Sequence, residues 1–206
     1  YNMNMTVLLH DNEIYGLTKN QTSPTSRKGL KSNTAPRGAY LEALNPLSTT
    51  LGVANVSFVA QAVDWVPTLL YEIISQAFHH KGLSFIRVVQ RCPEFLPTLL
   101  DPWVQDPERL LVLTHEDGVQ ASEELSRTYR QQDAHDPSEL NRAREIASLT
   151  DQIPVGILYR NDDVPCYEDI RCSERLVTPK TIRASLEAEL DKFTVWPPSE
   201  GREGPG

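Results

Sequence analysis

The sequence predicts an α/β protein built around a parallel β-sheet. Three short apolar runs, residues 6–10, 57–62 and 83–89, are predicted strands because polar or turn residues bound each of them. Helices are expected between them, and the order strand, loop, helix, strand, helix, strand favours right-handed crossovers within one sheet. In such sheets ligands bind at the carboxyl ends of the strands, where the loops after His10 and Gln90 begin. The first strand is expected to be buried.

Two helices are predicted between these strands. Asn45 and Pro46 begin the first, with Asn as the N-cap and Pro in the first turn. Pro67 begins the second, and Gly82 is expected to end it in a left-handed conformation. One apolar face of the second helix is expected to be buried: Leu69, Leu70, Ile73, Ile74, Ala77 and Phe78.

The second half of the chain predicts a less regular structure. It contains a proline-rich crossing segment (93–107), a short apolar run (110–114), a polar stretch (116–137), a helix (137–150), an extended segment (154–159) and a last helix (179–193). The expected division of the chain is a sheet domain over 1–100, an irregular α-helical C-terminal extension over 101–195 and a disordered tail over 196–206.

Charge and composition exclude several classes of function. The 206 residues carry a formal net charge of -8, so no basic stripe is available to neutralise nucleic-acid phosphates or an anionic membrane surface. No apolar run approaches the roughly 20 residues of a membrane helix. The three cysteines, Cys92, Cys166 and Cys172, do not suggest a disulfide framework, so a reducing cytoplasm is the expected location.

The densest group of polar residues and glycine follows the first strand, from Asp11 to Ser26. The side-chain oxygen of Asn12 and the carbonyl of Ile14 are the kind of oxygen ligands that Mg²⁺ takes, usually together with a phosphate. Gly16 allows a ligand to approach the backbone closely. Thr18 and Lys19 add a hydroxyl and a positive charge, although the same residue types are also typical of a polar turn.

As a motif, this segment resembles the second half of the thiamine-diphosphate site in the β subunits of 2-oxoacid:ferredoxin oxidoreductases. The matching letters are Asp-Asn-x-Ile-Tyr-Gly-Leu-Thr-Lys-x-Gln-x-Ser-Pro-Thr-Ser, over residues 11–26. The resemblance implies the parallel-sheet half of a thiamine-diphosphate-binding domain. It also implies magnesium ligands at Asn12 and Ile14, a cofactor pocket lined by Gly16, Leu17 and Thr18, and a catalytic position for Lys19 near the substrate carboxylate or coenzyme A.

The sequence departs from the family pattern in two places. Asn20 stands where the family usually has glycine, and a Cβ at this position restricts the backbone of the loop. No Gly-Asp-Gly, the family's first half of the motif, occurs before Asn12. The first magnesium ligand is therefore absent, and we expect the chain by itself to form an incomplete active site.

A second segment carries a possible cluster ligand. Residues 79–93 resemble the family's His-Lys-Gly-Phe-x-Phe-Ile-x-Val-x-x-x-Cys-Pro stretch, whose Cys is the last ligand of a [4Fe-4S] cluster in the enzymes that have one on this subunit. The resemblance implies that Cys92 is that ligand and that the other three thiolates come from outside this chain. Taken alone, Cys92 is typical of a buried core cysteine. His79 and His80 are expected to be structural, at the end of a helix.

The resemblance implies a subunit of a cytoplasmic, heteromeric oxidoreductase. A looser match, over residues 153–160 and 167–168, extends it toward the end of the family's β subunit. The implied reaction is oxidative decarboxylation of a 2-oxo acid to acyl-coenzyme A, with electrons passed to ferredoxin. The implied partner is the α subunit, which holds the glutamate that activates thiamine. The alternatives are another thiamine-diphosphate-dependent decarboxylase or synthase and a non-catalytic remnant that binds a partner subunit.

Overall fold

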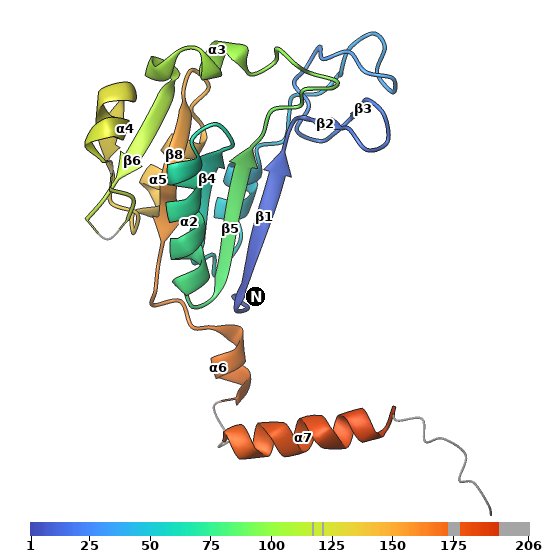
Figure 1. Cartoon of the computed structure of the whole chain (residues 1–206), viewed down its shortest axis with the longest axis vertical. Coiled ribbons are helices and arrows are strands. Elements are labelled where there is room, and N and C mark those ends of the chain that lie inside the picture. The colour runs from blue at the N-terminus through green and yellow to red at the C-terminus, as the bar shows by residue number, and fades with distance from the viewer. Residues whose placement is uncertain (117, 121, 173–177, 194–206) are drawn as a thin grey trace, which may run out of the picture. The chain divides into compact units, whose positions relative to one another are not determined.

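The computed structural model describes residues 1–116, 118–120, 122–172 and 178–193. Its central element is a six-stranded sheet, in which β1 is one outer strand (Figure 1) and β7 is the other. The order across the sheet is β1 (Met5–Asp11), β5 (Leu83–Val89), β4 (Phe58–Val63), β8 (Ile153–Arg160), β6 (Leu110–Thr114) and β7 (Gln132–Ala134). A separate antiparallel pair, β2 (Ile14–Tyr15) and β3 (Gln21–Thr22), follows the end of β1.

The three strands predicted from the first half of the sequence are parallel neighbours. β5 lies between β1 and β4, so that Phe85 has Val7 on one side and Val59 on the other. The prediction of one parallel sheet is therefore confirmed for these strands. Their carboxyl ends, after Asp11, Val63 and Val89, meet along one side of the sheet, which we call the carboxyl edge.

The segment predicted at 154–159 does form a strand, and it enters the middle of the sheet. β8 runs antiparallel to β4 and parallel to β6. The residues form two compact units, Tyr1–Glu168 and Asp169–Gly206, so no boundary between compact units falls at residue 100. The expected division into a cofactor-binding domain over 1–100 and a C-terminal extension over 101–195 stays a prediction.

Helices cover both faces of the sheet (Figure 1). α2 (Pro67–His79) packs against one face and α1 (Pro46–Leu51) and α5 (Leu140–Ala147) against the other. All six residues of β4 are buried between these layers. Full burial of a leucine or isoleucine side chain, such as Leu69 or Ile73, contributes about 1.5–3 kcal/mol.

The predicted start of α1 is confirmed by its capping geometry. Asn45 Oδ1 accepts hydrogen bonds from the backbone N–H groups of Leu47 (3.0 Å) and Ser48 (3.2 Å). Asn45 Nδ2 donates to the carbonyl of Ala147 in α5 (2.7 Å), so the same side chain also ties α1 to its neighbour in the layer.

The prediction for α2 was wrong at two residues. Phe78 is 78% exposed, because it lies one residue and about 100° of rotation past Ala77, which marks the edge of the buried stripe. The helix ends at His79, and His80 is already extended, so Gly82 does not cap it in the left-handed manner. Gly82 instead has φ +133 where the chain enters β5, and a Cβ there would lie 2.5 Å from Asn2 Oδ1.

The prediction that the first strand is buried was also wrong for the described residues. Residues 6–10 of β1 alternate between exposed and half-buried side chains, and Leu8 is 41% exposed. The cause is its place in the sheet: in the part of the chain that the structure describes, β1 pairs with β5 alone, and α2 covers β4 and β5 rather than β1.

A cluster of polar side chains lies at the opposite edge of the sheet, where β1, β4 and β5 begin. Ser57 Oγ donates to Asn2 Oδ1 (2.7 Å) and lies 2.9 Å from His80 Nε2, while His80 Nδ1 lies 3.1 Å from Asp162 Oδ1. Burial lowers the pKa of His80, against the opposing effect of Asp162. At His80, the C-cap of α2, the backbone is extended and the side chain joins this cluster.

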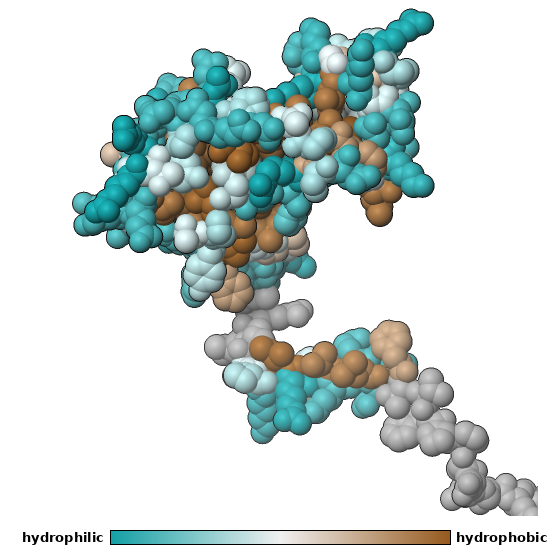
Figure 2. Space-filling view, turned by 45° about the horizontal axis from the view of Figure 1, so that its top comes forward, coloured by the Kyte–Doolittle hydropathy of each residue, from teal (hydrophilic) through white to brown (hydrophobic). Residues whose placement is uncertain are grey.

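The remaining elements are short, apart from one helix. They are α3 (Asp101–Val104), η1 (Pro107–Arg109), α4 (Glu123–Thr128), α6 (Tyr167–Cys172) and α7 (Pro179–Asp191). Helices predicted near 137–150 and 179–193 correspond to α5 and α7, whereas the tail over 196–206 lies outside the described residues. Figure 2 shows apolar side chains along one side of α7, where Ile182, Leu186 and Leu190 are each more than half exposed. No helix in the described ranges is long and apolar enough to cross a membrane.

Candidate functional site at the end of the first strand

The predicted cofactor turn begins at the carboxyl edge, directly after β1. Asp11 Oδ1 accepts a hydrogen bond from the Glu13 backbone N–H, and Asn12 Oδ1 accepts one from the Ile14 N–H, both at 3.1 Å. Glu13 between them is left-handed, with φ 60. Two overlapping side-chain turns of this kind orient the residues of a short loop without help from a helix or a strand.

Asp11 anchors this turn from the sheet. It is 4% exposed, and its carboxylate accepts from Thr25 Oγ1 (2.5 Å) and forms an ion pair with Arg87 Nη2 (2.6 Å). A buried carboxylate needs such partners, because desolvation otherwise costs several kcal/mol. The backbone position of Asn12 is therefore fixed by a residue whose own side chain is locked.

Glu13 anchors the turn on its other side. Arg27 Nη2 donates to Glu13 Oε1 (2.7 Å), and the Arg27 guanidinium carbon lies 4.4 Å from the centroid of the Trp103 ring. Burial raises the pKa of Glu13, while the hydrogen bond from Arg27 acts in the opposite direction. Ser26 Oγ donates to the Glu13 carbonyl (2.5 Å), so the loop over 23–27 folds back onto the turn.

The hairpin of β2 and β3 presents the remaining motif residues. Gly16 faces the ring of Phe95, which an added Cβ would meet at 3.7 Å. Leu17, at the tip, is 99% exposed. Lys19 and Asn20 are both left-handed, with φ 66° and 61°, and asparagine is one of the few residues besides glycine that adopt this conformation readily.

The two predicted motifs meet at the carboxyl edge. Phe95, which packs near Gly16, lies three residues after Cys92, and the Leu96 N–H donates to the Cys92 carbonyl (3.1 Å). Cys92 is 8% exposed and belongs to neither hydrophobic cluster. The structure therefore brings the segment with Cys92 next to the hairpin that carries the motif.

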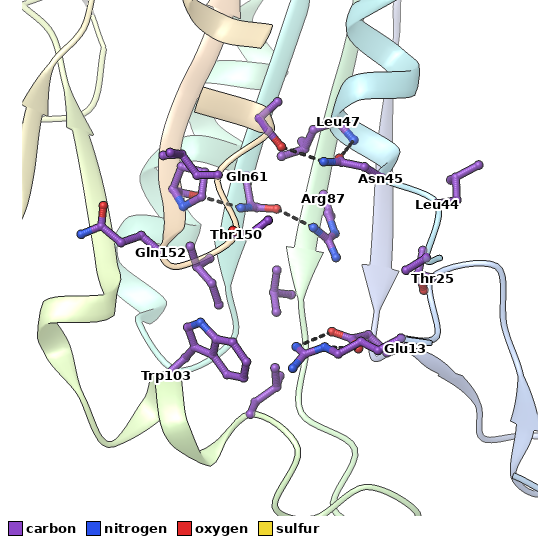
Figure 3. Close-up of a pocket in the computed structure, with 18 residues that line it drawn as sticks. Glu13, Thr25, Leu44, Asn45, Leu47, Gln61, Arg87, Trp103, Thr150 and Gln152 are labelled. Carbon is purple, nitrogen blue, oxygen red and sulfur yellow. Dashed lines mark hydrogen bonds and ion pairs between the residues drawn. The ribbon is translucent and has the colours of Figure 1, made fainter. Parts of the chain in front are cut away.

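Two cavities flank the turn. One, of about 340 Å³, is lined by Asn12 and Ile14 together with residues of α1. The other, of about 390 Å³, lies over the ends of β4 and β5, and Figure 3 shows Glu13, Gln61, Arg87 and Trp103 around it. Leu17, Thr18 and Lys19 line neither cavity, because they lie at the exposed tip of the hairpin.

The donor set at Asn12 fits magnesium better than a transition metal. Its neutral amide oxygen has a second lone pair beyond the bond from Ile14, and magnesium takes oxygen ligands while keeping water and phosphate in its shell. Across the described ranges no group of three or more His, Cys, Asp or Glu residues is placed to hold a metal ion. A magnesium ion at this turn therefore needs further ligands, such as the oxygens of a diphosphate.

The described cysteines lie at opposite ends of the sheet. Cys92 follows the carboxyl end of β5. The Cys166 thiol contacts Glu168 Oε2 (2.8 Å), which also accepts from the Asn4 N–H just before β1 begins. These two cysteines cannot share a cluster within the chain, because the length of the sheet separates them. The side chain of Cys172 lies outside the described residues.

Sequence reasoning missed the buried Gln61 and the half-buried Arg87, which support the turn. Gln61 and Arg87 occur inside runs that read as continuous apolar strands. A buried Gln or Arg in such a run is the signal that indicates a partner, because it cannot remain unpaired there. Glu13 and Arg27 were not recognised as a pair, because no periodic spacing links the two residues.

Comparison with known proteins decides between the families that share such a turn. Residues 1–88 match the model of the thiamine pyrophosphate enzyme C-terminal TPP-binding domain. Residues 125–173 match the model of the C-terminal part of the pyruvate ferredoxin oxidoreductase β subunit. The chain belongs to the 2-oxoacid:ferredoxin oxidoreductase β-subunit family. The order of the two matches along the chain is the order of a thiamine-diphosphate-binding domain followed by its C-terminal region.

Individual members of this β-subunit family support the assignment over most of the chain. A 2-oxoacid:ferredoxin oxidoreductase subunit β from Sulfolobus sp is 35% identical over 174 residues, 82% of this chain and 52% of that protein. The 2-oxoglutarate oxidoreductase subunit KorB of Mycobacterium tuberculosis is 42% identical over 94 residues, 46% of this chain and 25% of that protein. The chain spans 52% to 59% of the length of the Sulfolobus protein and of two similar β subunits, from Aeropyrum pernix and Saccharolobus solfataricus.

A solved structure shares the fold. The 2-oxoglutarate:ferredoxin oxidoreductase from Magnetococcus marinus, with 2-oxoglutarate, coenzyme A and succinyl-CoA bound, has a TM-score of 0.66 and 29% identity. The match covers 90% of this chain and 58% of that one. The α/β fold with a mostly parallel sheet and a helical C-terminal region is thus that of the family.

Proposed function

We propose that this chain supplies the magnesium and thiamine-diphosphate turn of a 2-oxoacid:ferredoxin oxidoreductase. The observation that carries the proposal is the turn after β1, where locked side chains on both sides present Asn12 beside a cavity of about 340 Å³. The family match over residues 1–88 supports the same site. The activity of the whole oxidoreductase is oxidative decarboxylation of a 2-oxo acid to acyl-coenzyme A, with electrons passed to ferredoxin.

The residues of the turn and hairpin have separate roles in this proposal. Asn12 ligates magnesium through its side chain and Ile14 through its carbonyl, while Gly16 allows the diphosphate to approach the backbone. Leu17 and Thr18, at the exposed tip of the hairpin, line the part of the cofactor that extends outside the cavity. The exposed ammonium of Lys19 attracts the carboxylate of the 2-oxo acid or a phosphate of coenzyme A, since no ion pair within the described ranges engages it.

Thiamine diphosphate, when bound, supplies the carbanion chemistry that releases carbon dioxide from the 2-oxo acid. The chain's own contribution is to hold magnesium and to keep the turn in one conformation. We further propose that Cys92 is one ligand of a [4Fe-4S] cluster, with the other three thiolates from outside this chain, and that the activating glutamate comes from the partner α subunit. The proposed location of this heteromer is the cytoplasm.

The experiment that tests the proposal compares two asparagine variants in the assembled oxidoreductase. Asn12→Ala should lose magnesium-dependent binding of thiamine diphosphate in calorimetric titration, because the side-chain ligand is gone. Asn141→Ala is the matched control, since Asn141 lies exposed on α5, where its side chain accepts a hydrogen bond from Arg144 (3.4 Å). Parent-level binding in Asn12→Ala would overturn the assignment of the turn. Equal losses in both variants would indicate general damage to the fold and would likewise count against it.

A further inference from the structure

A row of polar side chains crosses the parallel strands just below the cofactor turn. Arg87 on β5 is opposite Gln61 on β4, and Asp11 on β1 lies one diagonal step away on the same face. Arg87 Nη1 donates to Gln61 Oε1 (3.1 Å; Figure 3), and Gln61 Nε2 donates to the Pro154 carbonyl of β8 (2.7 Å). The row therefore connects the turn with three other strands.

The two oxygens of Asp11 have different partners. Oδ2 faces Arg87, with Nε at 2.8 Å and Nη2 at 2.6 Å. Oδ1 accepts from the Glu13 N–H (3.1 Å) and from Thr25 Oγ1 (2.5 Å). Because the carboxylate is planar and rigid, the guanidinium that fixes Oδ2 also fixes the direction from which Oδ1 holds the turn.

Burial makes this arrangement depend on arginine. The side chains of Asp11 and Arg87 are 3% and 19% exposed, so the guanidinium shields most of the Asp11 carboxylate from solvent. A lysine ammonium would be a point charge without the planar fork, and it could not hold Asp11 and Gln61 in the same way.

We propose that Arg87 is a positioning residue for the cofactor turn. It holds Asp11, which orients the Glu13 amide and thereby sets where the Asn12 side chain and the Ile14 carbonyl point. Gln61 holds Arg87 from the other side and is itself held by the Pro154 carbonyl, so the second half of the chain also contributes to the geometry. This inference rests on the proposed function, because it assigns to Arg87 an effect on magnesium bound at that turn.

The test uses the assembled oxidoreductase and three arginine variants: Arg87→Met, Arg87→Lys and Arg91→Met. Arg91 is the matched control, because it forms an arginine–aspartate pair with Asp64 (3.0 Å) at the same edge of the sheet without contacting the turn. Thiamine diphosphate is titrated calorimetrically at a series of magnesium concentrations. The hydrogen-exchange rate of the Glu13 amide is measured as a readout that needs no cofactor.

Arg87→Met should raise the half-saturating magnesium concentration by about 10–100-fold, the usual loss when a group that supports a metal ligand is removed. It should also accelerate exchange of the Glu13 amide. Arg87→Lys should fall between Arg87→Met and the parent, while Arg91→Met should stay within about twofold of the parent, as for an exposed pair.

Parent-like magnesium dependence in folded Arg87→Met would overturn the inference and leave the proposed function standing. If Arg87→Met fails to fold, the test rests on Arg87→Lys. Parent-like magnesium dependence together with parent-like exchange of the Glu13 amide in Arg87→Lys would overturn the inference in the same way. Absence of magnesium-dependent binding in the parent assembly would remove the proposed function, and this inference with it.

Discussion

Arg27 Nη2 and Nε each lie 2.7 Å from a different carboxylate oxygen of Glu13. Oε2 has no hydrogen bond among the described residues, so its contact with Nε is an ion pair only. The Glu13 side chain is 8% exposed, whereas that of Arg27 is 37% exposed. The arginine therefore closes the buried carboxylate off from solvent at the surface of the site.

Removal of this arginine should destabilise the fold. Arg27→Met leaves the buried Glu13 carboxylate without its charged hydrogen bond, and the free energy of unfolding should fall by about 1.5–3 kcal/mol in urea titration. Arg127→Met is the control, because the pair of Arg127 with Glu123 is almost fully exposed and should change stability by less than about 0.5 kcal/mol. Equal effects of the two substitutions would contradict the role assigned to Glu13.

His80 should make stability depend on pH. Its pKa in the folded chain is lowered from 6.5 by burial, so between that lowered pKa and 6.5 the unfolded chain binds more protons than the folded one. The contribution of His80 to the free energy of unfolding should therefore be complete above pH 6.5, and stability should decrease as the pH falls below that value. The groups that face His80 are Asp162, Arg160 and Ser57.

The measurement for His80 is urea unfolding of the parent and His80→Gln on both sides of pH 6.5. Glutamine keeps polar atoms near Ser57 and Asp162 but does not titrate, so the decrease toward acid should be smaller in the variant. An identical pH profile for the two proteins would show that His80 does not control this dependence.

The two faces of α2 should respond differently to truncation. Leu69 is fully buried, and Leu69→Ala should lower the free energy of unfolding by about 2–5 kcal/mol. Phe78→Ala deletes more atoms than Leu69→Ala. Its free energy of unfolding should nevertheless stay within about 0.5 kcal/mol of the parent value, because the Phe78 ring is exposed. A loss in Phe78→Ala as large as that in Leu69→Ala would contradict the observed orientation of the helix.

Cys92, and not Cys166, should be required for an iron–sulfur cluster in the assembled oxidoreductase. Cys92 lies beside the cofactor hairpin, whereas Cys166 lies at the other end of the sheet. Cys92→Ser should lose iron and the visible absorbance of the cluster, together with electron transfer to ferredoxin. Parent-level iron in Cys92→Ser, with loss in Cys166→Ser, is the result that would contradict the assignment.

The 206-residue chain alone should bind thiamine diphosphate weakly or not at all. Only Asn12 and Ile14 are proposed magnesium ligands, and the sequence contains no Gly-Asp-Gly to add another. Calorimetric titration with and without magnesium is the measurement. Binding in the low micromolar range that required magnesium would show that these two ligands suffice.

Local sequence by itself determined the elements whose causes lie within a few residues. Asn45 caps α1, Pro67 begins α2, and the apolar runs at 58–63 and 83–89 form parallel strands, because capping, backbone restriction and strand preference act over one turn or one strand. The motif over 11–26 likewise located the turn and hairpin, whose side-chain turns at Asp11 and Asn12 are local hydrogen bonds.

Only the tertiary structure decided which of these residues meet. Arg87 pairs with Asp11 across 76 residues, and Gln61 reaches the Pro154 carbonyl across 93. The antiparallel entry of β8, the exposure of Phe78 and the separation of Cys92 from Cys166 also depend on which strands become neighbours. The order of strands in the sheet depends on how whole faces of helices and sheet bury one another. The spacing of residues along the chain does not indicate this order.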